Sequence, residues 1–161
     1  MKQKGFTIVE IIVAIAIIVS ALGAILGFFS FEAKVAERER MRLKAISLAE
    51  EAMEATRNFR NNTTWSSTGI GNLSVGIDYH PASSSAGWDI ISGIENINEF
   101  SRKIVFNKVS RDANSNIEST YDPNPSNDDP NTRKVIVTIS WADREGQMSE
   151  TIKTYITNWR E

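Results

Sequence analysis

The sequence predicts an α+β protein in which one long N-terminal helix packs on a small antiparallel β-sheet. No proline interrupts the chain from Phe6 to Arg60, and the apolar run Ile11–Phe31 lies inside this stretch. After residue 60, several segments alternate apolar and polar residues, which is typical of half-buried strands. With 161 residues and 41% hydrophobic content, the chain has room for one membrane-length helix and one modest globular core.

The apolar run is long enough to cross a membrane. From Phe6 to Phe31 there are 26 residues, which as a helix span roughly 39 Å, against a hydrocarbon core of about 30 Å. The run exceeds the about 7 to 15 apolar residues of a cleaved secretory signal and has no clear small-residue processing site after it. We therefore expect a membrane-spanning helix.

Small residues recur on one face of this helix. They are spaced four, three and four apart, at Ala16, Ser20, Gly23 and Gly27. Such a face lets helices approach closely, which favours helix packing. Small residues are also frequent in membrane helices in general, so both interpretations remain open.

Glu10 is a carboxylate just ahead of the apolar run. An acidic side chain at the centre of a membrane helix costs about 2.5 to 3.5 kcal/mol, and less toward the helix end. The residue therefore has either a charged partner or a solvated position at the level of the lipid headgroups.

The segment Gly5-Phe-Thr-Ile-Val-Glu10, behind a short basic leader and ahead of an apolar helix, resembles the processing motif of type IV prepilins and type II secretion pseudopilins. The resemblance implies that a prepilin peptidase, which is also the methyltransferase, cuts between Gly5 and Phe6 and N-methylates Phe6. It also implies that Glu10 meets the α-amino group of a neighbouring subunit during assembly. At low dielectric, these two charges attract strongly and offset each other's desolvation.

The resemblance also implies partners and a location. The partners are the peptidase, other pilin or pseudopilin subunits, an inner-membrane assembly platform and membrane lipid. The chain would be a single-pass inner-membrane protein with an extracytoplasmic domain, later incorporated into a filament. Its regions would be a cleaved leader (1–5), a membrane and polymerisation helix (6–31), an amphipathic continuation (32–60) and a β-rich domain (61–161). Basic residues after the span outnumber those of the leader, so the orientation rests on the resemblance and not on charge.

Residues 47–57 resemble the corresponding helix of minor pilins and minor pseudopilins. Two features depart from common pilin patterns: the chain has no cysteine for a C-terminal disulfide, and its first proline is Pro81. The presence of Glu10 argues against the tip-capping type of pseudopilin, which lacks this acidic residue. The alternative interpretation is a signal-anchored extracytoplasmic ligand-binding domain that enters no filament.

Beyond the span, the helix becomes amphipathic. Its predicted core stripe has spacings of four, three, four, three and four, at Met41, Ala45, Leu48, Ala52, Ala55 and Phe59. Charged residues on the opposite side predict a solvated face. A continuous coiled coil is disfavoured by the many alanines and by the strands that follow.

The rest of the chain predicts strands and loops. Asn61–Thr64 ends the helix. Strands are expected at 72–79, 102–109, 134–142 and 148–159, and 116–121 is a candidate return strand. Residues 81–87 are expected to form a loop, whereas 89–100 fits a short helix as well as a strand. Gly146 lies in the turn of the clearest hairpin.

The residues for catalysis are largely missing from the sequence. It has one histidine and no cysteine, which excludes common zinc sites and a Cys–His nucleophile pair. No phosphate-binding or dinucleotide glycine motif is present, so we expect no enzyme and no cofactor. The formal charge is −2, and removal of two leader lysines makes it more negative, which argues against nucleic acid as the main partner.

The weak metal candidate is a loop with three carboxylates, Asp122, Asp128 and Asp129. Carboxylate and amide oxygens suit a hard cation such as calcium. The loop lacks the glycine and ligand spacing of an EF-hand, and its prolines and asparagines are typical of an exposed turn. We therefore expect no metal site, with calcium as the less favoured interpretation.

Overall fold

The computed structural model describes residues 5, 7–85, 87–143 and 146–159. The chain divides into two compact units, Met1–Met41 and Arg42–Glu161. Helix α1 (Ile8–Asn62) runs through both, so the predicted uninterrupted helix is confirmed. By length and composition α1 is able to cross a membrane, a test that a signal sequence also passes.

Helix α1 begins with a local cap that the sequence encodes. Thr7 precedes the helix, and its carbonyl accepts hydrogen bonds from the amides of Glu10 and Ile11 at 3.1 and 3.2 Å. The Thr7 hydroxyl lies 3.4 Å from the Glu10 amide. This is the geometry of an N-cap three residues ahead of an acidic side chain, which favours helix initiation.

In the second unit, α1 packs through a face of small residues. The buried residues of the helix are Ala45, Ala49, Ala52, Met53, Ala55, Thr56 and Phe59. Ala45, Ala49 and Ala52 are 0% exposed. The predicted stripe is therefore the core face, although Met41 and Leu48 are only half-buried.

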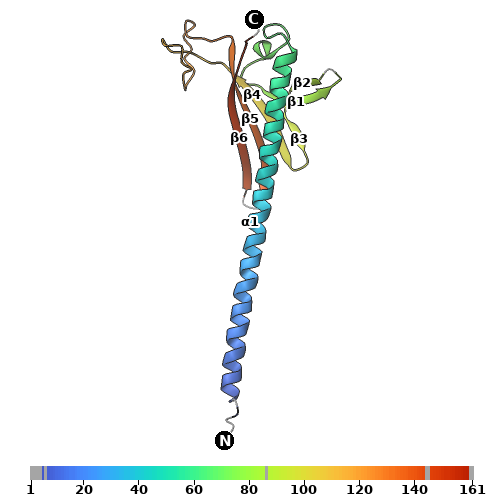
Figure 1. Cartoon of the computed structure of the whole chain (residues 1–161), viewed down its shortest axis with the longest axis vertical. Helices are drawn as coiled ribbons and strands as arrows, with labels where there is room; N and C mark the ends of the chain where they lie inside the picture. The colour runs from blue at the N-terminus through green and yellow to red at the C-terminus, as the bar shows by residue number, and fades with distance from the viewer. Residues whose placement is uncertain (1–4, 6, 86, 144–145, 160–161) are drawn as a thin grey trace. The chain divides into compact units, whose positions relative to one another are not determined.

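The sheet is antiparallel, with strand order β2-β1-β4-β5-β6 and β3 paired to β4. Figure 1 shows it beside the second half of α1. The strands are β1 (Asp78–Ser84), β2 (Gly87–Ser92), β3 (Glu95–Ile97), β4 (Phe100–Asn107), β5 (Thr132–Asp143) and β6 (Gly146–Thr157). The α+β fold, with a long N-terminal helix on an antiparallel sheet, is confirmed.

The β5–β6 hairpin is the predicted one. Its register runs without interruption from Thr132 opposite Thr157 to Asp143 opposite Gly146. Gly146 has φ of 133°, a conformation that L side chains rarely adopt. On β5, Val135, Val137 and Ile139 are 0% exposed, as the period-2 pattern predicts.

Two predictions for residues 72–87 are wrong. Residues 73–77 form no strand, because Gly76 turns the chain with φ of 73° and donates its amide to the Phe106 carbonyl. Residues 81–84 continue β1 instead of forming a loop. Pro81 is tolerated there because β1 pairs with β4 only at Asp78 and Tyr79, so its missing N–H breaks no bond on that side.

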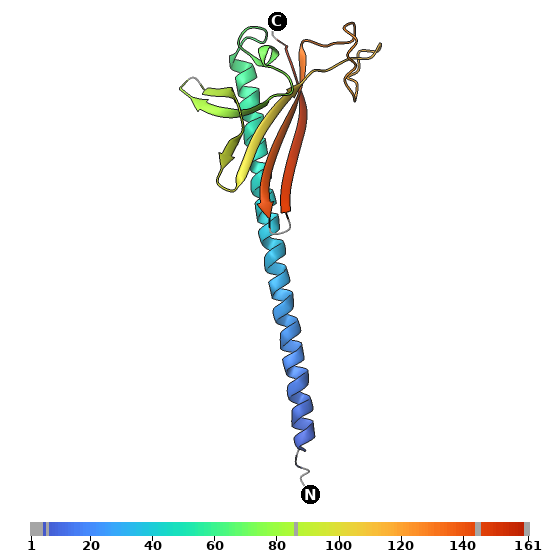
Figure 2. The same ribbon diagram turned by 180° about the vertical axis from the view of Figure 1, so that it is seen from behind.

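The structure also tests the predictions for residues 89–100 and 116–121. Residues 89–100 contain the rest of β2, all of β3 and the start of β4, so the strand alternative holds there and the helix does not. Residues 116–121 form no strand and contribute one isolated bridge, Arg111 to Ile117. Figures 1 and 2 show the β4–β5 loop (108–131) extending away from the sheet.

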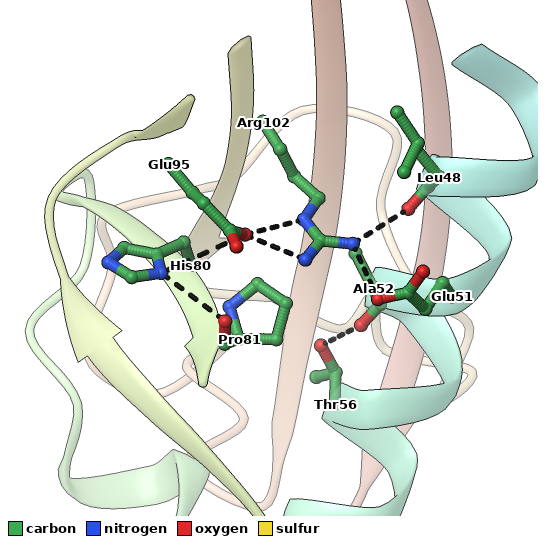
Figure 3. Close-up of polar contacts among 8 residues, drawn as sticks. All are labelled: Leu48, Glu51, Ala52, Thr56, His80, Pro81, Glu95 and Arg102. Atoms are coloured by element: carbon green, nitrogen blue, oxygen red, sulfur yellow. Dashed lines mark hydrogen bonds and ion pairs between the residues drawn. The ribbon is translucent and has the colours of Figure 1, made fainter. Parts of the chain in front are cut away.

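A buried arginine joins the sheet to the helix (Figure 3). The Arg102 side chain is 3% exposed. Its Nε and Nη2 donate to Oε2 of Glu95 at 2.9 and 2.7 Å, and its Nη1 donates to Oε1 of Glu51 at 3.0 Å. Nη1 also lies 3.4 Å from the Leu48 carbonyl. Burial of this guanidinium is possible because carboxylates from both β3 and α1 neutralise it.

Candidate processing and assembly site

The predicted processing residues lie just before helix α1. Phe6 and residues 1–4 lie outside the described residues. Gly5 is exposed, and a Cβ atom built on it meets nothing within 4 Å. Packing within the described structure therefore does not require glycine at this position. The helix starts at Ile8, so the predicted cleavage position precedes the first helical turn.

Glu10 lies in the first turn of α1 and is exposed. The N-terminus of a helix carries partial positive charge, which favours an acidic side chain there. Among the described residues, no basic side chain forms an ion pair with Glu10. Its carboxylate is therefore placed where a cation from outside the described chain has access.

The small residues of the apolar segment share one helical face. Ser20 Oγ donates to the Ala16 carbonyl at 2.8 Å, so this hydroxyl is satisfied within its own helix. Cβ atoms built on Gly23 and Gly27 meet nothing within 4 Å. The face is shallow and its polar group is satisfied, which makes it suited to a close helix neighbour; packing itself stays a prediction.

Each of the three loop carboxylates interacts with its own donor group from the protein. Asp122 accepts from Asn127 Nδ2 at 2.8 Å, Asp128 lies 3.3 Å from Lys108 Nζ, and Asp129 accepts from Arg111 Nε at 2.6 Å. Within the described ranges, no group of three or more His, Cys, Asp or Glu residues is arranged to hold a metal ion. The hydrogen bonds instead organise the β4–β5 loop.

The electrostatics of this loop follow from those contacts. Burial raises the pKa of Asp129, but hydrogen bonds from Thr132 and Arg111 outweigh it and hold the pKa below its ordinary value. The hydrogen bond and charge of Asp128 raise the pKa of Lys108. Hydrogen bonds from the Asn116 backbone and side chain lower the pKa of Asp112.

Residues 1–26 match the family model of the prokaryotic N-terminal methylation motif. No curated protein and no solved structure matches the chain. The fold is α+β and pilin-like, with a long N-terminal helix on an antiparallel sheet. Its N-terminus carries the prepilin motif of type IV pilin-like proteins.

The motif has direct consequences. It implies processing by a prepilin peptidase and assembly with other pilins, and it points to a structural protein instead of an enzyme. The apolar start of α1 fits membrane anchoring.

The roles of two structurally important residues, Thr7 and Arg102, were not predicted from the sequence. The Thr7-x-x-Glu10 spacing was an available signal for the start of the helix. No local pattern marked Arg102, because its carboxylate partners are 51 residues earlier and seven residues earlier in the chain.

Proposed function

We propose that the chain is a structural subunit, a minor pilin or a pseudopilin, of a type IV pilus or a type II secretion-like filament. The observation that supports this most is the match of residues 1–26 to the methylation motif, placed directly at the start of a membrane-length helix. A helix of this kind lies first in lipid and then, after assembly, among neighbouring helices.

In this proposal, the peptidase removes residues 1–5 and methylates the new terminus at Phe6. The helix of residues 6–31 then holds the subunit in the inner membrane, while residues 61–161 fold outside the cytoplasm. The assembly platform extracts the subunit, and residues 32–60 continue the helix into the filament. The helical start at Ile8 and the exposed apolar side chains of the helix suit this sequence of steps.

Glu10 supplies the assembly charge in this mechanism. Its carboxylate pairs with the α-amino group of a neighbouring subunit, and each charge offsets the desolvation of the other. In the first turn of α1, the carboxylate lies only a few residues from its own chain terminus after processing. A neighbouring subunit can therefore bring its own terminus to Glu10 through a short axial displacement.

Mass spectrometry of the mature protein tests the proposal. The expected chain begins at N-methylated Phe6 and is recovered both from membranes and from filaments sheared from cells. An intact chain beginning at Met1, found only in membranes, would contradict it. That result would instead favour a signal-anchored domain.

A further inference from the structure

The sheet ends in two open strand edges. β6 pairs with β5 along its whole length, and β2 pairs with β1. In the part of the chain that the structure describes, no strand lies beyond either of them. At β2, the Ile90 amide donates to the Asp89 side chain at 2.9 Å, a local bond that an added strand would replace. β6 has 12 residues and no proline, which leaves a long edge of main-chain donors and acceptors for another strand.

The orientation of α1 limits which strand can be added. Arg42 at one end of the domain helix contacts Glu150, and Arg60 near the other end donates to the Thr157 carbonyl. The helix therefore runs beside β6 in the same direction. A symmetric β6–β6 contact reverses one copy, which places the two Arg42 ends at opposite ends of the joined sheet. Subunits that point the same way along one filament, as the proposed function requires, cannot adopt that arrangement.

The second open edge has the required direction. Each successive pair in the order β2-β1-β4-β5-β6 is antiparallel, so β2 and β6 point the same way. Two copies in the same orientation can therefore place β6 of one beside β2 of the other as a parallel pair. This contact is heterologous, and repetition of it builds an open chain of subunits.

The side chains of the two edges are complementary in this arrangement. On β2, Ile90 is buried, and its neighbours Asp89 and Ile91 face the opposite side of the sheet. On β6, Ile156 is buried, and Lys153 and Tyr155 lie on that same outer side. A parallel register with Asp89 beside Lys153 also places Ile91 beside Tyr155. One ion pair and one apolar pair then form together.

We infer that β6 of one subunit pairs in parallel with β2 of the next copy of this chain, with Asp89 beside Lys153 and Ile91 beside Tyr155. The exposed apolar side chains support the pairing, since Ile91 is 43% and Tyr155 42% exposed in the isolated chain. On the inner side, the same register brings Trp88 beside Ile152. The partner of this surface is thus a second copy of the chain, and the contact adds to the helix packing of the proposed filament.

Disulfide trapping tests the inference, because the chain has no cysteine. Full-length chains carrying Asp89→Cys and Lys153→Cys, each with a different tag, are expressed together and oxidised in membranes and in sheared filaments. Level residues on neighbouring strands lie about 4.8 Å apart, within disulfide range. We expect a mixed disulfide dimer at least tenfold above the mixture of Asp89→Cys with Thr138→Cys. Thr138 has its side chain on the same outer face but lies one strand further in.

A charge exchange tests the register. With Ile91→Cys and Tyr155→Cys as the reporter pair, we expect Asp89→Lys or Lys153→Asp alone to lower the mixed dimer several-fold. The combined exchange, Asp89→Lys with Lys153→Asp, is expected to restore it. If the yield of the mixed dimer does not change with the charges at residues 89 and 153, the assigned register would be overturned.

The outcomes separate this inference from the proposed function. Sheared filaments that contain processed chain without the mixed disulfide would overturn the strand pairing and leave the subunit role intact. Mixed disulfides in membranes that yield no filaments would support the pairing and count against the subunit role. Absence of the disulfide from both fractions would overturn the pairing.

Discussion

Glu10 combines two physical roles at one position. As the third residue of α1, it follows the Thr7 cap, where a negative side chain complements the helix dipole. As a carboxylate at the start of an apolar helix, it is also the charge that the proposed assembly uses. In the first role the negative charge contributes only about 0.3 to 1 kcal/mol, whereas the second role depends on a full negative charge.

The substitution Glu10→Gln separates these roles, because it keeps the shape and removes the charge. We expect normal cleavage between Gly5 and Phe6, since the residues around the cut are unchanged, and at least a tenfold loss of subunit from sheared filaments. A tenfold loss corresponds to about 1.4 kcal/mol of assembly free energy. Quantitative immunoblots of sheared and membrane fractions measure it. The control is Glu32→Gln on the same helix, and equal filament yields for both variants would contradict the role of Glu10.

Arg102 is the residue whose loss is expected to cost most stability. Its guanidinium is buried and bonded to Glu95 and Glu51, so Arg102→Met leaves two carboxylates without their cation. We expect the free energy of unfolding to fall by about 1.5 to 3 kcal/mol, the range of hydrogen bonds to charged groups. Urea unfolding of the full-length chain in detergent checks this.

A matched control is Arg57→Met, because Arg57 pairs with Glu54 on the exposed helix face at 3.3 Å. Exposed pairs of this kind contribute about 0.3 to 0.5 kcal/mol. Equal unfolding midpoints for the Arg57 and Arg102 variants would show that the buried contact does not stabilise the join between helix and sheet.

At the scale of elements, the β4–β5 loop is held by its own polar side chains. Asp129 bonds Arg111, and its backbone carbonyl accepts from the Thr132 amide where β5 begins. The pKa of Asp129 lies below its ordinary value of 3.8. The folded state therefore binds protons less readily than the unfolded state, so the stabilisation is present above pH 3.8 and is lost as the pH falls through the lowered pKa.

The variant Asp129→Asn is accordingly expected to be less stable than the unmodified chain at pH 7. The difference in urea midpoint is expected to shrink as the pH is taken well below 3.8. Glu99→Gln, in the exposed β3–β4 turn, serves as the control. A constant difference across that pH range would mean that the charge of Asp129 contributes nothing to folding.

The elements also show what sequence patterns can and cannot predict. The β5–β6 hairpin was predictable because Val135, Val137 and Ile139 keep a strict period of two on one face. The alternation of Leu73, Val75 and Ile77 has the same period, yet Gly76 turns the chain there.

In the candidate site, the motif around Gly5 and Glu10 could be predicted because its residues are close together in the sequence. The Arg102 contacts were not, because they are set by the packing of β3 and β4 on α1. The loop prediction at Pro81 failed for a related reason. A strand tolerates proline only where its missing N–H has no partner, and this depends on which neighbouring strand β1 pairs with at that point.

At the scale of the whole molecule, the prepilin motif predicts the topology of the chain. With the leader inside, residues 61–161 are expected outside the cytoplasm. Because the chain has no cysteine, Ser85→Cys gives a single label site on the exposed β1–β2 turn. A membrane-impermeant maleimide is expected to label it in intact spheroplasts. Gln3→Cys, in the leader of unprocessed chain from cells without prepilin peptidase, is the control and is expected to react only after lysis; the reverse pattern would contradict the topology.

The alanine face of α1 has a mechanical consequence. The domain helix runs beside β6 in the same direction and is fixed to it near both ends, through Arg42 and Arg60. A pull that enters the domain at Arg42 along the helix axis therefore loads the contact between helix and sheet in shear. The alanine contacts and the Arg102 ion pairs then share the force and must yield together, whereas a pull across the sheet would break them one after another. The domain is thus expected to resist tension along its helix better than tension across it.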